Sequence, residues 1–267
     1  MDEQKVFDTA LEQLDECLLT ATGLSGGRIG IEHTGRQNRV LTSYAKMITH
    51  CMSLQALCRK HQTLPEGAKL LDHFSVAALA RCVIDSAIMT LYLSEPSLTL
   101  PQWDLRRHLL FLHALTNRKR FLTSLKKIQA DGTNVPFFEN YEEIKLGLKS
   151  VIDQRCEELQ ISFEQRGDLK NGQVVFISGV RGAVREAKID VNKFDFFHTY
   201  FSNHIHSHPV SLLNANEQEI SFSAPSPFQL GLCATCISAA VEYLTAVNAR
   251  VEMFTGEISR DPVGPLE

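Results

Sequence analysis

Apolar residues recur every three or four positions along most of the 267-residue chain, and this spacing constrains its fold more than any other feature. Residues spaced in this way share one face of an α-helix, which can pack against other helices. The runs cover residues 3–22, 40–58, 72–95, 101–130, 139–165, 190–208 and 226–255. We therefore predict an all-α fold, a single bundle of about seven helices. More than about 55% of the residues should be helical, well above the usual third.

Two short segments depart from the helical spacing. Val174 to Ile177 follows the Asn171-Gly172 turn signal and is β-branched and aromatic, while apolar and polar residues alternate in Glu219–Ser223. Both patterns are typical of short strands, so a small β-hairpin is the most that we expect. The chain has no internal repeat and no long low-complexity linker. We predict one helical bundle domain over residues 1–255 and a flexible tail over residues 256–267.

Composition and charge limit the classes of function. Apolar residues make up 44% of the chain and charged residues 22%, which is enough apolar material for a core. The net charge of −4 gives no overall attraction to nucleic acid or anionic lipid. The start of the chain is acidic and amphipathic, unlike a signal peptide, and the seven cysteines lack framework spacing. We expect a cytoplasmic protein with reduced thiols.

The most apolar stretch, Val76 to Leu93, carries the charged residues Arg81 and Asp85. A membrane helix needs about 20 residues with few charges, so we predict a buried core helix and no membrane span. Arg81 and Asp85 are four residues apart and share a helix face. Since an unpaired buried charge is costly, we expect both to be largely buried and bonded. They form either a structural ion pair or part of a polar site in the core.

Histidines cluster in the segment FHTYFSNHIHSHP. His204 and His208 are four residues apart and continue a stripe of phenylalanines, so both should point at the core. Such a pair can bind a metal, but the zinc-protease form needs a glutamate between the histidines. A third ligand would have to come from another part of the chain, and Asp85 is the best candidate. Metal-binding, structural and catalytic roles remain open. We take Arg81, Asp85, His204 and His208 as candidate catalytic residues, with Asp85 beside an imidazole, and predict no metal or cofactor.

The fourth predicted helix is strongly basic. Its only acidic residue is Asp104, with Asp131 just beyond its end, against seven cations: Arg106, Arg107, Arg118, Lys119, Arg120, Lys126 and Lys127. In a chain of negative net charge this concentration is local, and it is able to contact phosphate groups. A solvated helix face is the other interpretation. The candidate nucleic-acid contacts are Arg106, Arg107, Arg118, Lys119 and Arg120.

Two segments together resemble a family of uncharacterised bacterial helical proteins. LARCVIDSAIMTLYLSE resembles the Arg-x-x-x-acid helix of that family, and YFSNHIHSHP resembles its Tyr-x(3)-Ser-x(3)-His-Pro signature. Tyr200, His208 and Pro209 match by position, whereas His204 replaces the usual serine and Asp85 the usual glutamate. Such proteins are similar in layout to the HEPN superfamily, whose helical bundles often dimerise and include RNA-cleaving toxins and phage-defence effectors. The resemblance implies a homodimer, RNA binding and a role in antiviral defence.

The HEPN ribonuclease signature is an arginine followed, after four to six residues, by a histidine. Arg107 and His113 match this spacing within the basic helix, with His108 where a polar residue commonly follows the arginine. Arg107 and His113 are therefore the alternative catalytic pair. Two hypotheses follow. The first is a helical interaction or sensing module of a defence or toxin system, with a partner protein or RNA. The second is a metal-independent ribonuclease.

Overall fold

The structure is a computed structural model. It describes residues 2–128, 139–205, 209, 213, 217–221 and 223–256. Within these ranges, helix accounts for 78% of the residues and no strand is present. The all-α prediction is therefore confirmed for the described part of the chain.

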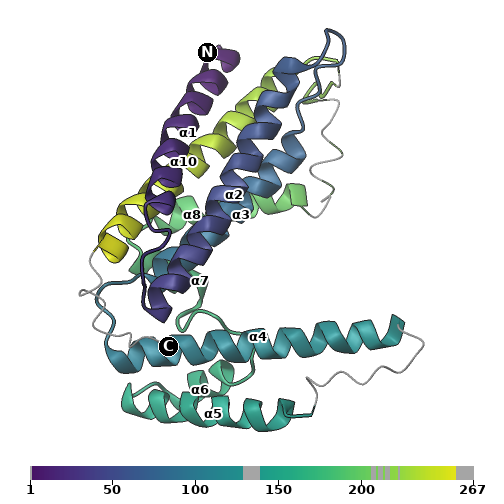
Figure 1. The fold of residues 1–267 in the computed structure, drawn as a ribbon. Coiled ribbons are helices and arrows are strands. Elements are labelled where there is room, and N and C mark those ends of the chain that lie inside the picture. Colours follow the sequence, from purple (N-terminus) through teal and green to yellow (C-terminus); the bar gives the residue numbers. More distant parts are fainter. Residues whose placement is uncertain are drawn as a thin grey trace. The chain divides into compact units, whose positions relative to one another are not determined.

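The described residues form nine labelled helices, slightly more than the seven predicted (Figure 1). They are α1 (Glu3–Gly26), α2 (Gly35–Thr63), α3 (His73–Leu93), α4 (Leu100–Ile128), α5 (Tyr141–Glu158), α6 (Phe163–Leu169), α7 (Gly179–Glu186), α8 (Val191–Ile205) and α10 (Pro227–Gly256). The fifth predicted helix is divided into α5 and α6. The break lies at Gln160, whose φ of 55° is left-handed, and Ser162 then caps α6 by accepting from the backbone of Gln165.

Neither predicted strand forms among the described residues. Val174 and Ile177 instead pack against the core between α4, α5 and α6. Glu219 has a left-handed φ of 50° and ends a turn over residues 217–219, and the Ser221 hydroxyl accepts from the backbone N–H of Ser223. The physical reason is that a strand needs a neighbouring strand for its backbone hydrogen bonds, and the described part of the chain offers none. Phe222, on which the second pattern depended, lies outside the described residues.

Helix starts follow the capping residues that the sequence provides. The Asp72 carboxylate accepts from the backbone N–H of Ser75 at 3.0 Å, which begins α3. Ser226 begins α10 in the same way, because its hydroxyl accepts from the Gln229 N–H while the Gln229 side chain accepts from the Ser226 N–H. The predicted starts of these two helices are confirmed.

The chain groups into two compact units, where the sequence suggested one bundle. Unit 1 comprises Met1–Pro96 and Val184–Glu267, and unit 2 comprises Ser97–Ala183. In unit 1, α3 packs against α2, α8 and α10, while α1 packs against α10 and α2 (Figure 1). The phenylalanine stripe of α8 is buried here, as predicted. All seven cysteines are free thiols, and Cys233 and Cys236 are small buried residues of α10.

Two helices of unit 1, α3 and α10, are long and apolar enough to cross a membrane by length and composition alone. In each, however, most of the apolar window is buried against other helices, 67% in α3 and 61% in α10. The packing gives these apolar faces a partner within the protein. The prediction of a buried core helix over Val76 to Leu93 agrees with this packing, and the cytoplasmic location remains a prediction.

Unit 2 is built on a hairpin of α4 and α5, with α6 packed beside it (Figure 1). The two long helices run antiparallel, because Asp104 at the start of α4 bonds Arg155 near the end of α5, and Lys119 bonds Glu142 at its start. Its core cluster consists of Leu105, Leu109, Leu112, Ile152, Cys156 and Leu169. These residues lie in the first half of α4, the second half of α5 and the end of α6. The core is therefore confined to one end of the hairpin.

Candidate functional site

Arg81 and Asp85 form the ion pair that their spacing predicted. Their burial differs, however: the Arg81 side chain is 13% exposed and the Asp85 side chain is 54% exposed. The expectation that both are largely buried is therefore wrong for Asp85. The apolar faces of α3 are covered by α2, α8 and α10, and Asp85 lies on the part of the helix surface that these neighbours leave open.

Arg81 also bonds two side chains of α8. Its Nε donates to the Ser202 hydroxyl at 3.3 Å, and its Nη2 contacts Nε2 of His198. A guanidinium can only donate, so Nε2 of His198 must accept and the imidazole is neutral. Burial lowers the pKa of His198 and the Arg81 charge lowers it further, partly opposed by Asp85 and Asp195. Arg81 therefore ties α8 to α3.

His204 has a different partner. Its ring lies 6.4 Å from the ring of His73, edge to face, and 5.6 Å from the ring of Tyr200. Burial lowers the pKa of His204, and the neighbouring His73 lowers it further. His208 lies outside the described residues. Of the four candidate catalytic residues, the structure thus joins Arg81 with Asp85 and places His204 against His73.

The antiparallel pairing of α3 and α8 explains this arrangement. His73 at the start of α3 is level with His204 at the end of α8, so Arg81, eight residues along α3, is level with residues earlier in α8. His198 and Ser202 occupy those positions, and neither is among the four residues predicted from the sequence. A signal was present: His198 follows the buried Phe194 by four residues, and Ser202 follows His198 by four, which places all three on one face.

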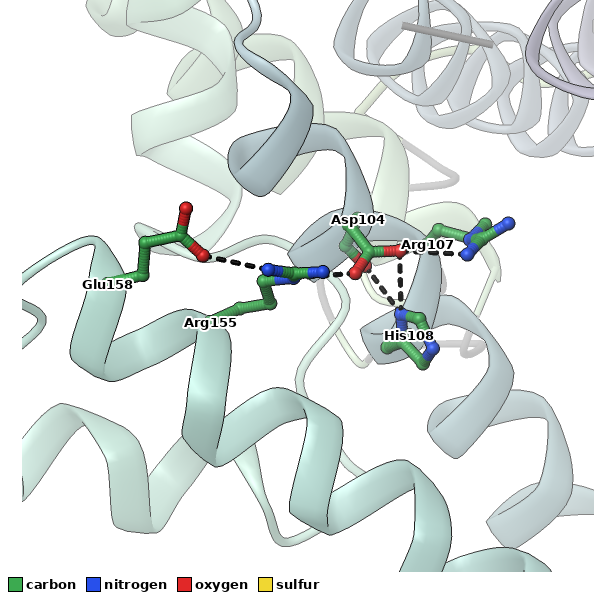
Figure 2. A network of polar contacts seen from close by, with 5 residues as sticks. All are labelled: Asp104, Arg107, His108, Arg155 and Glu158. Carbon is green, nitrogen blue, oxygen red and sulfur yellow. Dashed lines mark hydrogen bonds and ion pairs between the residues drawn. The ribbon is translucent and has the colours of Figure 1, made fainter. Parts of the chain in front are cut away.

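A second polar network lies in unit 2 and joins α4 to α5 (Figure 2). The Asp104 carboxylate accepts from Arg107 at 2.8 Å and from Arg155 at 2.7 Å, and Nδ1 of His108 lies 3.3 Å from it. Arg155 also donates to Glu158. Burial acts to raise the pKa of Asp104, but the bonds from Arg155 and Arg107 and the nearby His108 lower it overall. The network holds the two helices together beside the core cluster.

The alternative catalytic pair is not brought together on α4. Arg107 is paired with Asp104, whereas the His113 ring contacts the side-chain amide of Asn117 at 3.0 Å. Side chains six residues apart on an α-helix point in directions that differ by about 120° around the helix axis. Burial lowers the pKa of His113, and the charge of Arg120 lowers it further. On one chain, Arg107 and His113 therefore do not face a common phosphate position.

The five candidate nucleic-acid contacts have different environments. Arg106 is buried, which corrects that part of the prediction, whereas Arg107 is partly exposed and paired with Asp104. Lys119 donates to Glu142 at 2.9 Å, and its ammonium lies 3.9 Å from the centre of the Tyr141 ring. Arg118 and Arg120 are exposed. The basic surface of α4 consequently begins at Arg118.

The last part of α4, Arg118–Ile128, is called the α4 tip below. Because Lys119 is level with the first residues of α5, α4 continues for nine residues beyond that level. The Phe121 and Ile128 side chains are 65% and 81% exposed. With the half-buried Leu125 they are spaced i, i+4, i+7 and share a helix face. Five cations and no acid lie in these eleven residues.

The fold and these sites define an all-helical protein of two compact units, with internal ion-pair networks and a basic, apolar helix tip. Comparisons with the sequence models of protein families, with curated proteins and with solved structures give no match to this chain. No group of three or more histidine, cysteine or acidic side chains suited to a metal ion occurs among the residues that the structure describes. The resemblance to HEPN-like proteins therefore rests on the two sequence segments alone.

Proposed function

We propose that this protein is a helical interaction module that binds a partner through the α4 tip. The observation that carries the proposal is the exposure of Phe121 and Ile128 on a helix end that projects beyond its neighbour. Large apolar side chains at i, i+4 and i+7 are the anchors with which a helix binds a hydrophobic groove. An exposed apolar stripe bordered by cations on a projecting helix end is typical of a binding site.

The internal networks support an interaction role over catalysis. Arg81 is bonded to Asp85, His198 and Ser202, and its charge is used to join two helices. A phosphodiester-cleaving site needs an arginine aimed at the phosphate and a histidine within about 3 Å of the proton that it moves. Among the described residues, both arginines of the catalytic hypotheses serve ion pairs within their own unit. The resemblance adds the expectation that the partner belongs to a bacterial defence or toxin system.

RNA binding is the second candidate function, favoured by one observation. The α4 tip combines five cations with an exposed aromatic ring, Phe121, and single-stranded RNA binds such surfaces by phosphate contacts and base stacking. Leu125 and Ile128 are aliphatic, however, and offer no stacking surface. Their presence on the same face favours an apolar protein partner.

A photo-crosslinking amino acid at position 121 tests the proposal in the cells that produce the protein. The matched control carries the same amino acid at Phe163, an exposed phenylalanine of α6 outside the tip. We expect a discrete, nuclease-resistant adduct from position 121 that disappears in an Ile128→Asp background. The same adducts from both positions, or none from position 121, would overturn the proposal. A nuclease-sensitive adduct would instead support RNA binding.

The ribonuclease alternative has its own test. Purified protein is incubated with total RNA and with tRNA, beside a His208→Ala variant. Cleavage that this substitution abolishes would establish catalysis by the segment YFSNHIHSHP. Intact RNA with both proteins would exclude this activity for the isolated chain.

A further inference from the structure

A groove runs between α1 and α10 on the surface of unit 1. Its cavity has a volume of about 420 Å³, within the range of clefts that bind ligands and side chains. The lining residues extend from Gln13 to Leu24 on α1 and from Val241 to Glu252 on α10. At 1.5 Å per residue, the groove is about 16 Å long. It is thus long enough to receive two turns of another helix.

Hydrogen bonds between three helices fix the floor of this groove. Asn248 accepts from the Tyr44 hydroxyl at 2.6 Å and donates to the backbone carbonyl of Cys17 at 3.3 Å. The Cys17 thiol in turn lies 3.4 Å from the Thr245 hydroxyl. These contacts join α1, α2 and α10, so the groove is formed before any partner arrives. A preformed groove avoids part of the ordering cost of binding.

The border of the groove is acidic and partly apolar. From Asp2 onward, α1 and its cap carry six acidic residues and one lysine. Glu16 and Glu252 are exposed members of the groove lining, which also includes the apolar side chains of Leu24, Val241 and Ala249. The border therefore presents negative charge around apolar surface, the opposite charge pattern to that of the α4 tip.

From this complementarity we infer that the α4 tip of one chain binds the α1/α10 groove of a second copy of the same chain. The inference rests on the proposed function and names its partner. Phe121, Leu125 and Ile128 span about 10 Å along their helix, which fits within the 16 Å groove. Lys126 and Lys127 supply the charge that Glu16 and Glu252 attract, which also steers the two copies together.

The interface would be heterologous, because it joins two different surfaces. Pairing of two α4 tips is disfavoured, since each carries five cations and no acid. In a heterologous contact each copy keeps a free tip or a free groove, so assembly continues until a ring closes. The average assembly size therefore rises with protein concentration and falls as salt screens the charges.

Two charge-reversed variants of the full chain test the inference by sedimentation velocity. The tip variant is Lys126→Glu/Lys127→Glu, and the groove variant is Glu16→Lys/Glu252→Lys. For each variant alone, the dissociation constant of self-association should be at least about tenfold higher than that of the parent. Mixed in equal amounts, they should associate again about as strongly as the parent, because an intact tip meets an intact groove and the reversed tip and the reversed groove also carry opposite charges.

The control variant Lys46→Glu/Lys60→Glu changes the net charge as the tip variant does, but on exposed positions of α2, and should associate like the parent. Circular dichroism checks that every variant keeps the parent's helix content. A parent chain that stays monomeric, or a mixture of the two variants that associates no more than either variant alone, would overturn the inference. In that case a position-121 adduct with another protein would still support the proposed function, whereas loss of both results would reject the two together.

Discussion

The guanidinium of Arg81 on α3 donates to Nε2 of His198 on α8, and this contact requires a neutral imidazole. The same interface holds His73 and His204, and burial is the main cause that lowers the pKa of each of the three histidines. Protonation of His198 would place two cations against each other. The packing of α8 on α3 is therefore coupled to pH.

The first prediction concerns acid stability. Because the folded-state pKa of His198 lies below its unfolded value of about 6.5, the unfolded state binds more protons in acid. This contribution to the free energy of unfolding is complete above pH 6.5 and is lost as the pH falls below it. His198→Gln keeps an acceptor for Arg81 but does not titrate. Urea unfolding between pH 7.5 and 5 should show a smaller loss of stability for the variant, and equal losses would contradict the argument.

The second prediction compares the two members of the α3 ion pair. Asp85 is half exposed, so Asp85→Ala should lower the free energy of unfolding by less than about 1 kcal/mol. Arg81→Ala removes the donor to His198 and Ser202, so the partly buried acceptor of His198 loses its bond, and it should cost about 1–3 kcal/mol. Urea midpoints of the two variants decide the matter. Equal costs, or a larger cost for Asp85→Ala, would show that the pair is buried on both sides.

The third prediction concerns the network of unit 2 (Figure 2). Asp104→Asn removes the negative charge that Arg107 and Arg155 share, and should cost about 1–3 kcal/mol. Because the pKa of Asp104 is lowered in the folded state, its contribution is present above about pH 4 and is lost in stronger acid. Asp168→Asn, at an exposed position of α6, is the control and should leave unfolding unchanged. Hydrogen exchange of α4 and α5 amides reports the change within unit 2.

The fourth prediction contrasts two glycines of unit 2. Gly172 has a φ of 76°, and a Cβ there would lie 2.3 Å from the Thr116 hydroxyl oxygen. Gly172→Ala should therefore be destabilising by more than about 1 kcal/mol, through backbone strain and a steric clash. Gly147 lies within α5 with open space around it, so Gly147→Ala should stabilise by about 0.5–1 kcal/mol. Thermal unfolding of both variants should move in opposite directions, and shifts of the same sign would contradict this reading of unit 2.

Much of the local structure of this protein was predictable from its sequence. Three features depend only on residues within about one turn of each other: the helix starts at Asp72 and Ser226, the buried stripe of α8 and the Arg81–Asp85 pair. Periodicity and capping in the sequence indicate such relationships directly. The two expected strands failed for a related reason. A strand pattern is local, but a strand forms only if a partner strand lies beside it.

The sequence by itself thus determined the helices, their caps and their apolar faces, because these follow from interactions between neighbours in the chain. Only the tertiary structure decided that His198 rather than His204 meets Arg81, since this depends on how α3 and α8 align. It also decided that Asp85 is exposed, that Arg106 is buried and that the α4 tip projects beyond α5. Each of these depends on which surfaces other helices cover, and burial at one position is set by residues far away in the chain.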